Sequence, residues 1–523
     1  MPRPRGAHAS ARVYTGSIRP RTAGHAMEPA RRSICFTSKT LAKVMAMSSR
    51  LPLAGVLRLG RPSDIWFKPA LSVVAAVAPP NLALLALGRL DLAMYTMAGS
   101  LCALYAHNRP YAARARALAW VILGMLGGLA TALLAASLTR SAVVLVAVGA
   151  ALAAVQKVLC DATRIGPPGN VVLTFISSAA LFVPQSPDRI PGHLGLAAAA
   201  GAWAWLVGMA PGLLRPHGPE RRATAAALNA VAAHAEAHVS GEDTAGTHGT
   251  AVIAVRAARQ AVSSTTGTPL TVTHRALERL IVRSEVALAA PSDADPAPLR
   301  DWARQVRGNR PVPEVPHLTG VDSELAPNPG PLWHRLRPLA PLALRTALGC
   351  ALAGYASLAL GIGRPYWALV TAASLYQADL ALTWGRGVQR VVGNLLGVLF
   401  FAALVPLAHT GEVALVLCCL ALNFGAEALI GRNYWLGSVC VTPMALLITE
   451  FAGFRQPGPL ITERIVDTLV GALVGLAAAV VVPHRKRVVR AERAGPRTLA
   501  ATGSSRGRHP DQRTGNTTEG VRP

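Results

Sequence analysis

Apolar residues are concentrated in two sets of long stretches, and a polar, alanine-rich segment separates the two sets. A helix rises about 1.5 Å per residue, so roughly 20 apolar residues cross the ~30 Å hydrocarbon core of a bilayer. The first set contains six such stretches, at 69–88, 90–107, 116–138, 141–159, 168–185 and 194–214. The second set contains six more, at 340–362, 365–381, 388–408, 412–430, 435–453 and 462–483. The pattern predicts an all-α, polytopic membrane protein built from two tandem six-helix transmembrane halves.

The polar segment between the halves has a helical pattern of its own. Four of its stretches are expected to be helices, at 220–239, 250–262, 271–289 and 298–307. In the third, four apolar residues share one face opposite three arginines, which is typical of an amphipathic helix on a soluble core. No part of it resembles a ligand-binding motif. We therefore predict a cytoplasmic helical domain that packs on itself or on a second subunit.

The chain divides into five predicted parts. The first 67 residues are rich in Arg, Pro, Ser and Gly, contain no spanning stretch, and are predicted to be disordered. Met45 or Met47 is the translation start that we favour over a leader resembling a transit peptide. The other parts are the first transmembrane half (68–215), the cytoplasmic helical domain (216–336), the second transmembrane half (337–483) and a disordered basic tail (484–523).

The two halves share weak internal similarity. Small-residue positions recur in the same order in both: Gly88-Arg89 with Gly363-Arg364, Gly124 and Gly128 with Gly393 and Gly397, and Ile165-Gly166 with Ile430-Gly431. Six spans in each half give both the same orientation, so the pattern predicts a parallel repeat.

Composition and charge agree with a membrane protein. The chain is 52% hydrophobic and only 15% charged, which argues against a large soluble enzyme core. The net charge of +26 lies mostly in the tails and connecting segments, where basic residues fix membrane orientation, so we do not expect nucleic-acid binding. The seven cysteines lie mostly in apolar stretches without zinc-site spacing, so no metal or cofactor is expected.

Basic residues also predict an orientation. With the N-terminus inside, all but six of the 52 Lys and Arg residues lie on the cytoplasmic side. The six are Arg89, Arg140, Arg189, Arg364, Arg455 and Arg464. Most of the excess lies in long segments, so the support is modest. We expect a multi-pass protein of the inner or plasma membrane with both termini in the cytoplasm.

One face of the third span in the second half is polar. Arg386, Arg390 and Asn394 are spaced four residues apart, so they share one helical face. Gly393 and Gly397 lie beside them at the spacing that lets two helices approach closely. Lipid offers no hydrogen-bond partner, so this face is expected to point into the bundle or a water-filled path.

Four ordered motifs in the second half resemble the fusaric acid resistance protein-like (aromatic acid exporter) family. They are Arg364-Pro-Tyr-Trp after an apolar stretch, Gln389-Arg390-Val-Val-Gly-Asn-Leu-Leu-Gly397 with Arg386, Arg432-Asn-Tyr-Trp435 with Thr442-Pro443, and Arg464-Ile-Val-Asp-Thr468 with Gly471. Asn394 departs from the family pattern, in which Thr is expected after the glycine. The resemblance implies efflux of aromatic or other organic acids.

Acidic residues of the second half complete the candidate site. Asp379 and Glu427 are expected near the cytoplasmic side with Arg386, Arg390 and Arg432, which would form a positive inner mouth for an organic anion. These two carboxylates either change protonation during transport or form structural ion pairs. Asp467 shares a face with Gly471 and Gly475, so helix packing is favoured over a transport role for it. The aromatic pairs Tyr366-Trp367 and Tyr434-Trp435 are interpreted as a membrane-interface belt.

The sequence lacks the phosphate-binding loop and catalytic motifs of enzymes, so any active transport would use an ion gradient. We therefore predict a non-enzymatic transporter of small organic anions in the lipid bilayer that can assemble as a homo-oligomer. A passive organic-anion channel and a non-transporting membrane scaffold are the alternatives. Fewer than about ten membrane crossings, or Arg390 and Asn394 facing lipid, would contradict transport.

Overall fold

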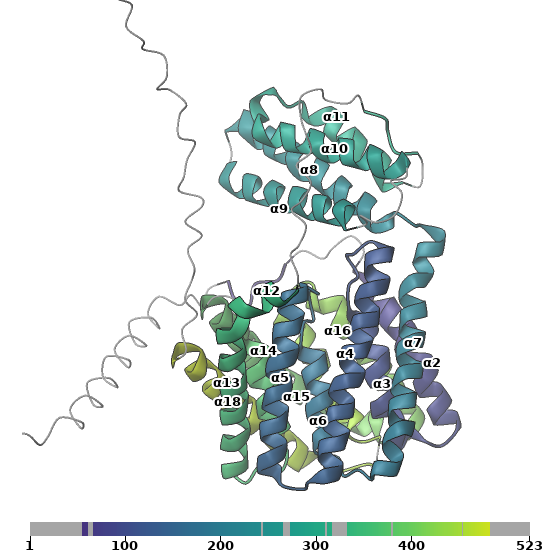
Figure 1. Ribbon diagram of the computed structural model, residues 1–523, viewed down its shortest axis with the longest axis vertical. Coiled ribbons are helices and arrows are strands. Elements are labelled where there is room, and N and C mark those ends of the chain that lie inside the picture. The colour runs from purple at the N-terminus through teal and green to yellow at the C-terminus, as the bar shows by residue number, and fades with distance from the viewer. Residues whose placement is uncertain are drawn as a thin grey trace, which may run out of the picture. The chain divides into compact units, whose positions relative to one another are not determined.

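The structure, a computed structural model, is helical throughout the part that it describes (Figure 1). The described residues are 55–60, 66–241, 244–264, 272–308, 311–315, 332–377, 380–451 and 453–481. The disorder predicted for residues 1–54 and for the C-terminal tail lies outside them. Residues 55–60 depart from the disorder expected for residues 1–67, because their backbone is hydrogen-bonded to the second half.

The first half contains six apolar segments. They are α2 (Phe67–Ala86), the combined segment of η1 (Leu90–Leu92), α3 (Ala93–Ser100) and η2 (Leu101–Leu104), α4 (Tyr111–Leu138), α5 (Ala142–Thr163), α6 (Val171–Leu181) and α7 (Ile190–Leu214), with η3 (Pro187–Arg189) before α7. The second half repeats this order with α13 (Ala340–Ala359), α14 (Tyr366–Leu375), α15 (Leu380–Ala408), α16 (Glu412–Ile430), α17 (Tyr434–Ile448) and α18 (Pro457–Val481), after α12 (Leu332–Leu336) and η5 (Arg337–Leu339).

The segment between the halves forms a small helical core of its own. It consists of α8 (Gly218–Ser240), α9 (Thr244–Ser263), α10 (Val272–Ala289), η4 (Pro291–Asp293) and α11 (Pro296–Arg307). Leu228, Leu277, Leu280 and Val306 are fully buried in this core. The apolar face expected on α10 therefore packs against neighbouring helices of the same segment.

Eight of the described helices are long and apolar enough to cross a membrane, and four shorter apolar helices accompany them. The prediction of six apolar segments in each half is confirmed, although four of the twelve are shorter helices than predicted. The short segments are 90–104, α6, α14 and α17, which are the second and fifth of each half. Predicted windows were too long there because they included irregular backbone, such as Pro168-Gly169 at the start of the 168–185 window and residues 376–377 near the end of the 365–381 window.

Contacts at the two ends of the bundle show that each short segment still carries the chain from one end to the other. Tyr105 donates a hydrogen bond to the Gly169 carbonyl at one end, and Gln185 donates to the Tyr95 hydroxyl at the other, both at 2.7 Å. In the second half, Arg345 contacts the Gln377 carbonyl at 3.0 Å, and His409 contacts Glu450 at 3.0 Å at the opposite end. The described chain thus traverses the bundle twelve times, eight times as a full-length helix.

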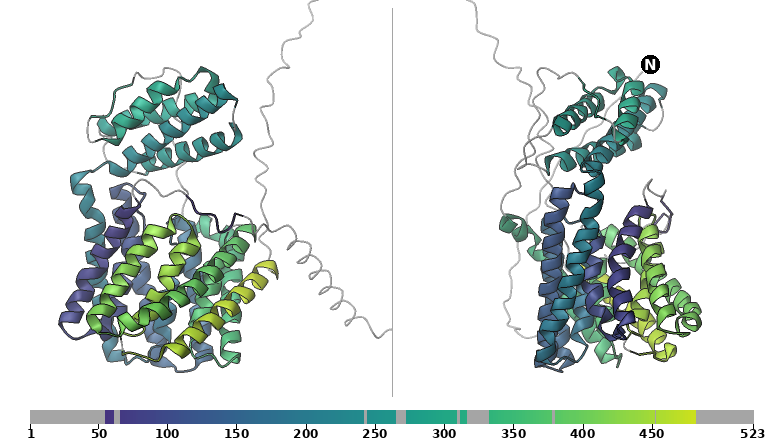
Figure 2. Two further views of the ribbon diagram at one scale, coloured as in Figure 1. Left: turned by 180° about the vertical axis from the view of Figure 1, so that it is seen from behind. Right: turned by 90° about the vertical axis from the view of Figure 1, so that its right-hand side faces the viewer.

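Packing between helices repeats from one half to the other. In each half the second segment packs on the sixth, and the third packs on the fifth and sixth. The first helix of each half packs on the fourth helix of the other half, as α13 on α5 and α2 on α16. Most first-half helices (blue) face the viewer in Figure 1 and most second-half helices (green to yellow) in the left view of Figure 2. These repeated pairings support the tandem arrangement.

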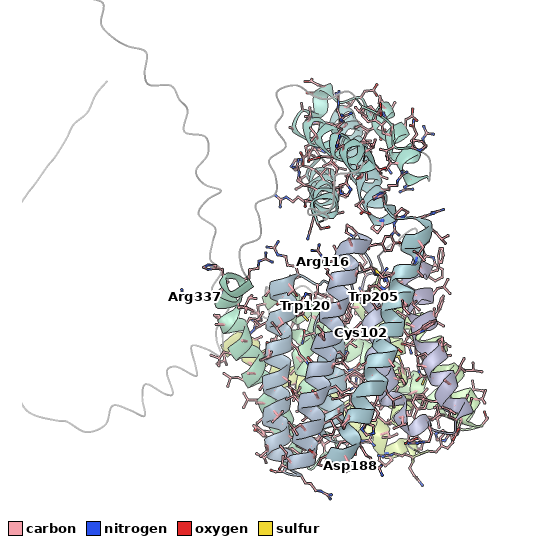
Figure 3. All side chains as sticks on the ribbon, turned by 45° about the vertical axis from the view of Figure 1, so that its right-hand side comes forward. Cys102, Arg116, Trp120, Asp188, Trp205 and Arg337 are labelled. Carbon is pink, nitrogen blue, oxygen red and sulfur yellow. The ribbon has the colours of Figure 1, made fainter. Side chains whose placement is uncertain are left out.

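Large apolar side chains on the long helices point away from the bundle. Trp120 on α4 is 71% exposed and projects outward in Figure 3. Leu399 on α15 and Leu473 on α18 are exposed to a similar degree. A surface of this kind suits lipid rather than water, since soluble proteins rarely leave such large apolar areas uncovered. The chain is a multi-pass membrane protein.

Candidate functional site

The polar face of α15 points into protein, as its spacing predicts. Arg390 is 4% exposed and Asn394 is 1% exposed, and both lie where α15 packs against α17 and α18. Lipid would leave both groups without hydrogen bonds, so burial against polar neighbours is the stable arrangement.

Asn394 joins three helices. Its side-chain oxygen accepts a hydrogen bond from the Thr442 hydroxyl of α17 at 2.7 Å. Its amide nitrogen donates to the Thr468 hydroxyl of α18 at 3.0 Å, and Thr468 donates to the Arg464 carbonyl at 2.7 Å. An amide has both a donor and an acceptor, so it can bridge two hydroxyl groups. This double role lets Asn394 connect α15 to both α17 and α18.

Two arginines of α15 converge on Tyr434, the first residue of α17. Arg390 donates a hydrogen bond to the Tyr434 hydroxyl at 2.9 Å. The Arg386 guanidinium lies over the face of the same ring, with its central carbon 4.0 Å from the ring centroid. A cation above an aromatic face is attracted by the ring's electron density. Tyr434 therefore holds both guanidinium groups without neutralising their charge.

Arg464 lies deeper in the bundle than its place near the start of α18 suggested. It is 1% exposed, and its guanidinium lies 4.0 Å from the centroid of Trp367 on α14. Among the described residues, no hydrogen-bond partner reaches its Nε or Nη1 atom. Arg464 and Arg390 lie on α18 and α15, two helices that pack against each other.

Asp467 lies about one helical turn from Arg464 on α18. It is fully buried, and one oxygen accepts a hydrogen bond from Ser357 of α13 at 2.6 Å. The other oxygen has no partner among the described residues. Glu463 contacts Arg364 at 3.5 Å, so that pair carries no net charge. Arg390 and Arg464 against Asp467 leave one uncompensated positive charge in the described centre of the bundle.

The predicted packing glycines lie at close helix contacts beside this cluster. A Cβ on Gly393 would lie 2.6 Å from the Ser438 Cβ, and one on Gly397 would lie 2.6 Å from the Thr442 Cβ, both on α17. A Cβ on Gly471 would lie 2.5 Å from a backbone oxygen of α14, and Gly475 meets the same helix. These contacts bring α15 and α18 close enough to their short partners for the polar side chains to meet.

The remaining predicted residues lie elsewhere. Glu427 and Arg432 line a large cavity at the end of the bundle that we call the basic end, together with Lys68, Arg109 and Arg164. Figure 3 shows Arg116 at this end of α4 and Asp188 at the opposite end of the bundle. Asp379 lies outside the described residues. The structure therefore separates the predicted set into a central cluster and a basic-end cavity.

His107 lies at the basic end and hydrogen-bonds Arg114 at 3.1 Å. Burial, reinforced by the nearby Arg114 charge, lowers the pKa of His107 to about 3. Because the imidazole is neutral at physiological pH, it adds no charge to the cavity. The positive potential there comes from arginine and lysine.

Sequence reasoning missed three central residues. Arg464 was expected near the outer surface, and Trp367 and Tyr434 were interpreted as interface aromatics. For Trp367, which is 1% exposed, that interpretation is wrong. A signal for Arg464 was present, because it shares the helical face of Asp467, Gly471 and Gly475. Glycines at this spacing lie where another helix packs closely, so the same face, including Arg464, is expected to point into the protein and away from lipid.

Comparison with known protein families finds a match in the second half. Residues 351–478 match the model of the family described as fusaric acid resistance protein-like. The match confirms the resemblance seen in the motifs, most of which lie inside it. It indicates membrane transport of some kind.

Two relatives extend the comparison. Over 472 residues the chain is 27% identical to the uncharacterized membrane protein YvaC of Bacillus subtilis (strain 168), covering 80% of this chain and 73% of that protein. Over 150 residues it is 27% identical to an uncharacterized protein of Synechocystis sp., covering 29% of this chain and 20% of that protein. No solved structure matches the chain.

Replacing Asn394 with Ala should lower the stability of the folded protein by about 1–3 kcal/mol, because the buried Thr442 hydroxyl loses its acceptor. Asn394→Thr should lie between Ala and the wild type, since one hydroxyl reaches only one of the two threonines. Size-exclusion chromatography of the heated protein in detergent measures the midpoint of unfolding. Asn108→Ala, in an exposed loop, is the matched control. Equal midpoints for the Asn108 and Asn394 variants would contradict the bridging role.

Proposed function

We propose that the second half moves small organic anions across the membrane, and that its physiological role is efflux of aromatic or other organic acids. The observation that carries this proposal is the uncompensated positive charge formed by Arg390 and Arg464 against Asp467. An isolated ion costs several kcal/mol to bury, so a buried charge of this kind calls for a partner ion. The family description supports an acid as that partner.

The cations mark a route through the bundle. Arg432 lies at the basic-end cavity, Arg386 and Arg390 meet at Tyr434, and Arg464 is reached next. Successive arginines favour anions and repel cations, as in other anion pathways. The excess of Lys and Arg supports a cytoplasmic position for the basic end and residence in the inner or plasma membrane. The cavity would then concentrate anions on the side from which efflux begins.

Two alternatives remain as outcomes of the tests. A passive anion channel would use the same arginines but would not respond to a proton gradient. A membrane scaffold would carry no flux. The structure holds Arg390 and Arg464 with few direct ion pairs among the described residues, which favours a ligand over a scaffold.

Flux of radiolabelled benzoate into proteoliposomes tests the function. Arg390→Gln and Arg464→Gln should each lower the rate at least tenfold, which corresponds to about 1.4 kcal/mol of lost anion stabilisation. Arg140→Gln, an exposed arginine at the opposite end, should leave the rate unchanged. Wild-type rates in the double variant Arg390→Gln/Arg464→Gln would contradict an arginine-based path, and absence of flux in the wild type would favour the scaffold.

Asp467 should make anion binding depend on pH. Its carboxylate competes with a transported anion for the same positive charge, so a proton on Asp467 should strengthen anion binding, and the coupling is reciprocal. The apparent affinity for benzoate is therefore expected to rise as the pH falls. Asp467→Asn should fix the high affinity and abolish this pH dependence.

Measurements of initial benzoate flux between pH 5.5 and 8, with imposed pH gradients of either sign, check this expectation. Asp188→Asn, at the opposite end of the bundle, serves as the control. A wild-type flux that ignores the pH gradient and follows voltage would instead establish the passive channel.

A further inference from the structure

Residues 55–60, which we call the strap, begin with a turn, and side chains of the second half bind their backbone carbonyls. Gln389 donates to the Val56 carbonyl at 2.8 Å, and the Asn433 amide donates to the carbonyls of Val56 and Arg58 at 3.1 and 2.9 Å. Trp435 donates its indole N–H to the Leu57 carbonyl at 3.1 Å. The Gly60 amide donates to the Arg432 carbonyl at 2.8 Å. Five hydrogen bonds thus join segments more than 300 residues apart in sequence.

The strap is built to fit this place. Gly55 has a φ of +93°, in the region that favours glycine, and Arg58 closes a turn onto its carbonyl at 3.1 Å. A Cβ on Gly60 would lie 3.0 Å from the Arg432 carbonyl oxygen, so a larger residue would press on the contact. The backbone of the strap therefore fits a receptor made by Gln389 of α15 and by Asn433 and Trp435 at the start of α17.

The strap buries little apolar surface. Val56 is its one half-buried residue, and the other five are exposed. Segments with few buried apolar contacts and solvent-exposed hydrogen bonds lie at the low-stability end of a fold. A segment held in this way opens and closes without unfolding its receptor.

The strap lies beside the arginines of the proposed anion route, at the basic end of the bundle. Val56 packs against Gly385, next to Arg386, and the receptor residues flank Tyr434 at the start of α17. The chain continues from the strap into α2 of the first half, whereas the receptor belongs to the second half. Movement of the two halves apart at this end would break the strap's contacts.

We propose that the strap is an internal gating segment whose backbone occupies a receptor formed by Gln389, Asn433 and Trp435, and that its binding holds the basic end of the anion route closed. This inference rests on the proposed function of the Arg386–Arg390 route. Release of the strap admits the anion, and rebinding closes the route behind it.

A reversible cross-link tests the gate. The Cγ atoms of Val56 lie 3.9 and 4.0 Å from the position of a Cβ on Gly385, so Val56→Cys/Gly385→Cys places two thiols in neighbouring positions that an oxidant can link. The reduced double variant should carry benzoate at the wild-type rate. Oxidation should lower its flux at least tenfold, and a reductant should restore it. Each single-cysteine variant, oxidised in parallel, should not respond.

A second experiment weakens the binding of the strap, and its main measurement, hydrogen exchange, does not require transport. Trp435→Phe removes the indole donor and keeps the ring, and Trp203→Phe removes a comparable indole-to-carbonyl bond within the first half as its control. Hydrogen exchange at Gly60 and across residues 386–394 in nanodiscs should be faster in Trp435→Phe and slower in the oxidised double variant. Only the Trp435 variant should raise benzoate flux.

The outcomes separate the two proposals. A cross-link proven by mass spectrometry that changes neither flux nor exchange across 386–394 would overturn the gate. Another outcome is that neither the wild type nor any variant carries benzoate, while hydrogen exchange across residues 386–394 still slows when the strap is cross-linked and quickens when it is released. That result would support the gate and contradict benzoate as a substrate.

Discussion

The rest of the structure depends on a positive charge that the described carboxylates of the bundle do not neutralise. Arg390 and Arg464 are both nearly inaccessible, and Asp467 offsets only one of them. Burying such a charge costs several kcal/mol unless it is paired. The surrounding interactions do not remove that cost. The Asn394 bridge, the Tyr434 hydroxyl and the face of Trp367 orient the arginines but leave their charge available to a ligand.

The equivalent helices of the first half carry no such charge in their buried polar network. The first half has a matching buried network, in which Gln156 of α5 hydrogen-bonds Thr174 and Ser177 of α6. Gly128, the counterpart of Gly397, packs against Gln156 and Ser177 as Gly397 packs against Thr442. Every group in that network is neutral. The same helix pairings thus support a neutral polar network in one half and a charged one in the other, which is why the proposed anion route is assigned to the second half.

Much of the architecture could be predicted from the sequence because hydrophobic length and glycine spacing are local signals. They located six segments in each half and the buried face of α15. These signals overestimated the lengths of the four short helices, since hydropathy alone does not distinguish a helix from an apolar loop that is buried in protein. Arg390 and Asn394 were recognisable from a period of four. Trp367 and Tyr434 were not, because aromatic residues near the start of a span suit an interface and a buried cation equally. The binding of the strap could not be predicted from the sequence. Its receptor donates side-chain hydrogen bonds to backbone carbonyls, and every residue has such a carbonyl, so the strap needs no particular side chains.

A structure determined with 4-bromobenzoate bound would test the central claim most directly, since bromine is located by its anomalous scattering. The account predicts a carboxylate within hydrogen-bond distance of Arg390 or Arg464, with the brominated ring inside the bundle. Bromine found only on the outer surface, together with a carboxylate of the protein already paired with each of the two guanidinium groups, would contradict it.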